Sequence, residues 1–305
     1  MDLIANILYD TIYHSTPVIL LVIGGVYAYK ANVLNIAMEG MLLFGAFSSA
    51  LMILTTGSLF YGLLFALIVN IFIGLVFSYF GITRKGNVII VGIAINLLTS
   101  ALAAFILKVK GMAIINLTEQ VDIASLKINI PLIKDIPFIG DVLSGHPITT
   151  YLTFILIFVL SIVMFRTKFG TYVRVVGENE EAAKSIGIKV NLIKYSAVIV
   201  GSLTAALAGY NLAVERLALY TNTMSAGRGF IAIAAIYCGR GKPKLSSIYA
   251  IIFGLAKALA INFKLFAGPV SGLFEAIPYL VMVIVLLLAS YLDNKNSWKR
   301  GYPNE

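Results

Sequence analysis

Residues 59–80, LFYGLLFALIVNIFIGLVFSYF, decide the fold class of this chain. This stretch contains no charged side chain, and as a helix its 22 residues are long enough to cross the ~30 Å hydrocarbon core of a bilayer. Six other apolar stretches have a similar character: 36–56, 88–107, 149–165, 195–214, 245–263 and 275–292. The chain is 60% hydrophobic and 12% charged, whereas soluble domains average about 45–50% and about 25%. The sequence therefore predicts an all-α polytopic membrane protein with a single transmembrane domain over residues 1–305.

Two further segments bring the expected number of transmembrane helices to about 8–9. Segment 7–28 is a weaker candidate because it carries Asp10, His14 and Pro17. Region 220–239 must also cross if the C-terminal lysines are to lie on the same side as residues 166–194.

Only about 228–238 of that region reads as an apolar helix, and such a helix is roughly 17 Å long at 1.5 Å per residue. The preceding TMSAGRG (223–229) would be non-helical backbone at membrane depth, which is tolerated only where protein or a water-filled cavity surrounds it. We expect a broken helix, and a short helix with a surface loop is the alternative.

The basic residues indicate the orientation of the chain. Fifteen of the 23 Lys and Arg fall in one set of alternate loops: Lys30, Arg84, Lys85, six within 166–194, Arg240, Lys242, Lys244, Lys295, Lys299 and Arg300. The positive-inside rule assigns these loops and the C-terminus to the cytoplasm, and the N-terminus to the outside. Because most of the positive charge lies in these loops, the net charge of +9 does not indicate a nucleic-acid partner. Residues 108–148 then form an extracellular excursion, expected as a short helix and loops.

A polar segment interrupts the apolar pattern at 175–190, VVGENEEAAKSIGIKV. Asn179 is suited to cap a helix that begins near Glu180, and Gly187 is suited to end it. A helix of about two turns is too short to be stable alone in water. It must be held by the flanking spans or dock against another protein.

The composition of this short helix favours docking over an ordinary solvated loop. Ala182 and Ala183 are expected to present a flat face, while Ile186 and Ile188 supply apolar side chains beside it. A slim apolar face of this kind suits insertion into a groove of a partner.

Three stretches together make the chain resemble a known family. VGENEEAAKSIGI (176–188) resembles the cytoplasmic coupling loop of permeases in ATP-binding-cassette (ABC) importers. VLNIAMEGMLLFGAF (33–47) and TMSAGRGFIAIAAIYCGRGKP (223–243) resemble the branch that transports nucleosides, simple sugars and branched-chain amino acids, and look most like its nucleoside-type members. The chain departs from that pattern at Glu180, where proline is frequent, and at Tyr237, where a small apolar residue is frequent.

The resemblance implies a set of partners. Residues 167–194 would be the coupling loop, and its short helix would dock on a cytoplasmic ATPase that binds the ATP and Mg²⁺, so that this chain binds no cofactor itself. The residues implied in docking are Gly177, Glu178, Asn179, Glu181, Ala182, Ala183, Ser185 and Gly187. A second permease chain is implied, as a heterodimer first and a homodimer second, together with membrane lipid and an extracellular substrate-binding protein.

The residues themselves exclude several other functions. CGRGKPK (238–244) lacks the first glycine and the final Ser or Thr of a phosphate loop, so the energy must come from another polypeptide and no enzyme is predicted. His14 and His146 have no second metal ligand at helical spacing, so no metal site is predicted. An ion-coupled secondary transporter stays as the alternative class, although the spans hold few acids for it.

Polar and aromatic residues near the spans are candidates for the substrate pathway: Asn35, Glu39, Phe44, Phe47, Asn96, Arg228 and Phe230. A charge near the bilayer centre costs about 2.5–3.5 kcal/mol, so Glu39 and Arg228 require a role. For Glu39 the alternative is a structural position near the interface. Arg228 is expected first to hold the broken helix through backbone carbonyls. By resemblance the expected substrate is a nucleoside, then a monosaccharide, then a branched-chain amino acid.

Overall fold

The computed structural model describes residues 3–131, 134, 136–264, 274 and 276–299 of the chain. Its helices are α1 (Leu3–Lys30), α2 (Met38–Thr56), α3 (Leu59–Ser78), α4 (Val88–Val109), α5 (Ile139–Leu143), α6 (Ile148–Arg166), α7 (Lys168–Glu178), α8 (Glu180–Ser185), α9 (Val190–Tyr210), α10 (Arg228–Cys238), α11 (Pro243–Lys264) and α12 (Ile277–Lys299). Two π-helical turns extend α3 and α9: η1 (Tyr79–Thr83) and η2 (Asn211–Arg216). The short strands are β1 (Ile115–Asn116), β2 (Lys127–Ile128), β3 (His146–Pro147) and β4 (Leu219–Tyr220).

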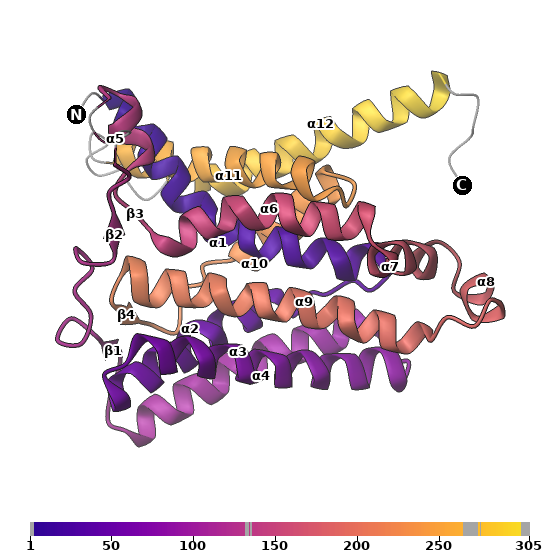
Figure 1. Cartoon of the computed structure of the whole chain (residues 1–305), viewed down its shortest axis with the longest axis horizontal. Helices are drawn as coiled ribbons and strands as arrows, with labels where there is room; N and C mark the ends of the chain where they lie inside the picture. The colour runs from indigo at the N-terminus through magenta and orange to yellow at the C-terminus, as the bar shows by residue number, and fades with distance from the viewer. Residues whose placement is uncertain (1–2, 132–133, 135, 265–273, 275, 300–305) are drawn as a thin grey trace.

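The long helices lie roughly side by side in an elongated bundle (Figure 1). At one end, called here the coupling end, stand α7 and α8, and α12 also runs towards this end. The four strands and α5 lie at the opposite end, where α1 begins. This arrangement agrees with a chain whose 108–148 excursion and 167–194 loop lie on opposite sides of one membrane.

Among the described residues, seven helical segments are long and apolar enough to cross a bilayer: Leu3–Lys30, Met38–Thr56, Leu59–Thr83, Val88–Val109, Ile148–Arg166, Val190–Arg216 and Pro243–Lys264. Two further helices, Arg228–Cys238 and Ile277–Leu288, are apolar but shorter. The all-α membrane fold is therefore confirmed.

The segment expected to be the weakest span is the most buried one. In α1, 83% of the apolar window is inside the bundle, compared with 28% for the segment that contains α3 and 22% for α4. The helix packs against α9, α10 and α11. Its polar groups find partners there, as where the Asp10 carboxylate accepts a hydrogen bond from the Asn262 amide. Its polar residues made α1 look like a weak membrane span in the sequence. A central helix can carry such residues because it contacts other helices instead of lipid.

Helix α10 has the bounds predicted for the apolar half of a broken helix. It is 11 residues long and contacts α1, α2, α11 and α12, so it lies within the bundle (Figure 1). Non-helical residues 221–227 lead into it from β4.

Most of the 108–148 excursion is loop with the short helix α5, as expected. The sequence did not predict its strands, of which β1 pairs with β4 and β2 pairs with β3.

Candidate functional site: the coupling loop and the polar groups of the bundle

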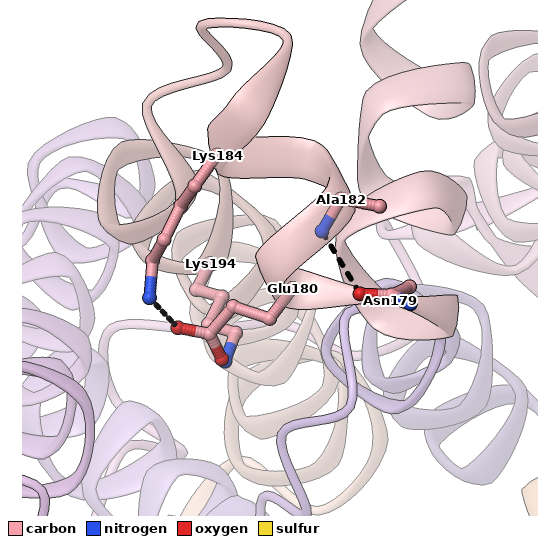
Figure 2. Close-up of polar contacts among 5 residues, drawn as sticks. All are labelled: Asn179, Glu180, Ala182, Lys184 and Lys194. Atoms are coloured by element: carbon pink, nitrogen blue, oxygen red, sulfur yellow. Dashed lines mark hydrogen bonds and ion pairs between the residues drawn. The ribbon is translucent and has the colours of Figure 1, made fainter.

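Helix α8 is capped at both ends by its own sequence. The side chain of Asn179 accepts a hydrogen bond from the Ala182 backbone N–H at 2.9 Å (Figure 2). At the other end Gly187 has φ +82°, a left-handed conformation that glycine adopts at little cost. The Ile188 N–H then reaches back to the Ala183 carbonyl at 3.0 Å, as in a helix-ending Schellman turn. Both predicted helix ends are confirmed.

Glu180 ties α8 to the rest of the chain. One carboxylate oxygen lies 2.7 Å from the Lys184 ammonium on the same helix, and the other lies 2.7 Å from the Lys194 ammonium near the start of α9 (Figure 2). These two hydrogen bonds, from Lys184 and then Lys194, lower the pKa of the Glu180 carboxyl to about 2. Glu180 therefore does more than occupy an early helical position, since it links α8 to α9.

Six of the residues implied in docking are exposed: Glu178, Asn179, Glu181, Ala182, Ser185 and Gly187. The expected flat face needs correction, because Ala183 is fully buried and packs into the main hydrophobic core of the chain. Ile188 also packs against that core, which leaves Ile186, 71% exposed, as the free apolar side chain. The surface available to a partner is thus the acidic and small-residue side of α8 with Ile186 beside it.

Gly177 is held inside the chain by the contact of α7 with α1. A Cβ atom at this position would collide with the backbone carbonyl of Lys30. Only glycine lets α7 approach the end of α1 so closely, so Gly177 sets the position of the loop.

Glu39 lies against the first turn of α10 and accepts two backbone hydrogen bonds. Its carboxylate oxygens lie 2.8 Å from the Gly227 nitrogen and 2.5 Å from the Gly229 nitrogen. Both N–H groups belong to the start of a helix, where they lack a partner within the helix and where the helix dipole favours a negative charge. The contact needs glycine at 229, because a Cβ there would lie 2.5 Å from the Glu39 nitrogen.

Arg228 folds back on the turn that precedes α10. One terminal guanidinium nitrogen donates to the Met224 carbonyl at 2.6 Å and to the Ser225 carbonyl at 3.0 Å. The Tyr279 hydroxyl donates to the Ala226 carbonyl at 2.8 Å in the same turn. These bonds satisfy carbonyls that no regular helix would satisfy, which is the role expected first for Arg228.

Asn35 and Asn96 hold the start of α2. The Asn96 side chain accepts from the Gly40 N–H at 2.7 Å and donates to the Ile36 carbonyl at 3.0 Å. Asn35 is buried and accepts from the Ala37 N–H at 3.1 Å. The polar pathway candidates therefore all bond to backbone at the starts of α2 and α10.

The aromatic candidates separate into three environments. Phe47 is buried and meets Tyr220 edge-on, Phe44 is half-buried against Phe47 with ring centroids 5.6 Å apart, and Phe230 is exposed. The pathway role of these rings stays a prediction.

Two adjacent buried ionisable residues at the end of η2, Glu215 and Arg216, were missed by the sequence analysis. The Glu215 carboxylate accepts hydrogen bonds from the Thr149 hydroxyl and from the Asn211 amide. The adjacent Arg216 donates to His14 Nδ1 at 3.0 Å and lies 3.6 Å over the ring of Tyr13. The sequence did offer a signal for them, namely two ionisable residues directly after an apolar span. Such groups need polar partners when they lie inside a bundle.

Among the described residues no group of three His, Cys, Asp or Glu side chains is placed to hold a metal.

Comparison with known proteins identifies the family. Residues 7–289 match the family described as "Branched-chain amino acid transport system / permease component". The chain belongs to this permease family. It is 31% identical to the guanosine ABC transporter permease protein NupQ of Bacillus subtilis, over 96% of this chain and 90% of that protein. It is 29% identical to the nucleoside ABC transporter permease protein NupC of Lactococcus lactis, over 94% of this chain and 91% of that protein.

A solved structure shares the fold of this permease. An inward-facing structure of a putative metal-chelate type ABC transporter superposes with a TM-score of 0.52 and covers 93% of this chain and 85% of that chain. At 16% identity this likeness concerns the fold alone. The chain is a multi-pass permease subunit of an ABC importer in the cell membrane, and its relatives imply an ATPase and a substrate-binding protein as partners. Permease components are not themselves enzymes.

Proposed function

We propose that this permease imports nucleosides, with its N-terminus outside and its coupling end in the cytoplasm. The observation that carries the substrate is the pair of relatives named for guanosine and nucleoside transport, each matched over at least nine-tenths of both chains. A monosaccharide is the second candidate, and a branched-chain amino acid, through the description of the family, is the third. The translocation path forms between this chain and a second, different permease chain.

The proposed mechanism starts at α8. Two ATPase subunits close when they bind ATP and Mg²⁺, and they move the exposed side of α8, which carries Glu181, Ala182 and Ser185. The Glu180–Lys194 ion pair passes this motion to α9, which packs against α1, α2 and α3. Rocking of these helices opens the path alternately to the two sides of the membrane.

The test is ATP-dependent uptake of labelled guanosine, uridine, ribose and leucine into proteoliposomes that hold the complete transporter. We expect nucleoside uptake in the wild type and at least a tenfold loss in Glu181→Arg, because the reversed charge opposes docking. Lys85→Glu is the matched control, since Lys85 is exposed in the α3–α4 turn and is not among the residues implied in docking. Its uptake should stay within twofold of the wild type.

The other outcomes are equally informative. Uptake of ribose or leucine alone would replace the proposed substrate while keeping the mechanism. Uptake that survives Glu181→Arg, or that follows an imposed ion gradient without ATP, would refute the coupling role of α8 and favour a secondary transporter.

A further inference from the structure

A cavity of about 610 Å³ lies at the coupling end, between α7 and the C-terminal ends of α1 and α10. This volume is within the ~300–1,000 Å³ range of sites that bind small molecules. The cavity is lined by Tyr29 and Lys30 of α1, Asn32 of the following turn, Arg174 and Glu178 of α7, and Tyr237 of α10. Its walls thus come from segments far apart in the sequence.

Positive charge predominates around this cavity. Lys30 and Arg174 line it together with the single acid Glu178. A Cβ at Gly241 would lie 2.8 Å from the Lys30 Cε atom, so the turn that carries the exposed Lys242 runs beside Lys30. Guanidinium and ammonium groups placed together in this way bind phosphate oxygens through charge-assisted hydrogen bonds.

Two aromatic rings form one wall of the cavity. The Tyr29 and Tyr237 rings meet edge-to-face, with centroids 5.1 Å apart and planes at 78°. Tyr237 is 45% exposed, so part of its ring is open to a ligand. A tyrosine face can stack on a nucleobase, and the amide of Asn32 supplies both a donor and an acceptor for polar groups on a base edge.

We propose that this cavity binds a soluble aromatic phosphate of the nucleoside monophosphate class, and that the bound ligand slows transport. The cations hold the phosphate and the tyrosine wall holds the base. A neutral nucleoside would leave the cations unused and binds more weakly. The binding part is independent of the proposed function, whereas the regulatory part rests on it.

The regulatory effect follows from the position of α7. Arg174 and Glu178 lie on α7, and the Gly177 backbone rests on the end of α1 at Lys30. Helix α7 ends at Glu178 and α8 begins at Glu180, so the two helices are separated by one residue. A ligand that bridges Lys30 and Arg174 fixes α7 against α1 and restricts the movement of the coupling helix.

The binding test uses the purified transporter in phosphatidylcholine nanodiscs, titrated with guanosine monophosphate by calorimetry. We expect binding at least about tenfold tighter than that of inorganic phosphate or guanosine, because each offers only half of the contacts. Arg174→Gln and Tyr237→Leu should each weaken binding about tenfold. Tyr237→Phe keeps the ring and should bind like the wild type. Arg166→Gln, an exposed arginine at the same end that does not line the cavity, is the matched control and should change the Kd less than twofold.

Two binding results would overturn the proposal. Equal affinity for inorganic phosphate and for the nucleotide would make this a simple anion site. Loss of nucleotide binding when phosphatidylglycerol replaces part of the phosphatidylcholine would assign the cavity to a lipid headgroup.

The regulatory part is tested by uptake with guanosine monophosphate on the ATPase side of the membrane. We expect a slower initial rate in the wild type, and in Tyr237→Leu the same inhibition only at about tenfold higher nucleotide concentration. Nucleotide binding without any effect on uptake would refute the regulation alone. Absence of nucleoside uptake under all conditions would refute the proposed function and leave the binding result in force.

Discussion

Helix α8 and the first turn of α10 are both capped by a polar side chain, but the two caps differ in reach and in burial. Asn179 caps α8 from three residues away, on the exposed surface. Glu39 caps α10 from a different helix, 188 residues away along the chain from Gly227. The first cap fixes the six-residue helix α8, of which four residues are exposed, and the second joins α2 to α10 inside the bundle.

This difference in capping indicates that the start of α10 is held more firmly than α8. An exposed cap contributes about 0.5–2 kcal/mol, so the loss of this single contact costs α8 little. At α10, two N–H groups, a close glycine contact and the Arg228 bonds act together, and breaking one leaves buried groups without partners. The coupling end is therefore suited to movement, and the α10 start is suited to hold its shape while neighbouring helices move.

Replacing Glu39 should have the largest effect. We expect Glu39→Leu to destabilise the permease by about 1–3 kcal/mol for the buried Gly229 N–H that it leaves unpaired, with a smaller addition for the half-buried Gly227 N–H. Thermal unfolding of the detergent-purified protein would show this as a lower Tm. Glu39→Gln keeps an acceptor oxygen, so its Tm should lie between that of the wild type and that of Glu39→Leu. If Glu39→Leu abolished uptake with an unchanged Tm, Glu39 would act on the substrate and not as a cap.

The same contrast explains which features could be predicted from the sequence. The bounds of α8 follow from Asn179 and Gly187 because both signals act within a few residues. The 11-residue α10 follows from its apolar run and from the number of crossings. The partner of Glu39, the first backbone N–H groups of α10, could not be predicted, because the local sequence does not show that α2 and α10 are in contact. The burial of Ala183 also depends on how α8 lies on its neighbours, which is a property of the tertiary structure.

Removal of the exposed cap should have a smaller and local effect. Asn179→Ala is expected to destabilise α8 by about 0.5–2 kcal/mol while the Tm of the bundle stays unchanged. Hydrogen exchange at the α8 amides should accelerate about 2- to 30-fold, which is that free energy expressed as an opening equilibrium. Asn179→Ser retains a capping oxygen and should exchange like the wild type. A fall in Tm for Asn179→Ala would show that α8 is part of the cooperative fold, and the contrast with α10 would disappear.

The smallest effect is expected at the two lysines that share the Glu180 carboxylate. Lys184 is 55% exposed and Lys194 is 13% exposed, so water screens the first pair more than the second. Lys194→Gln should therefore slow uptake more than Lys184→Gln, with both effects within the ~0.2–1 kcal/mol typical of surface pairs.

The pH dependence of this contact has a definite sign. Because the two lysines lower the pKa of Glu180 from 4.5 to about 2, the stabilisation is complete above about pH 4.5 and is lost as the pH falls towards 2. Glu180 should add no pH dependence to uptake between pH 5 and 8, so Glu180→Gln should lower the rate equally across that range. A rate that fell in the wild type but not in Glu180→Gln as the pH dropped from 8 to 5 would show that the carboxylate titrates there, and that the ion pair does not hold α8 to α9.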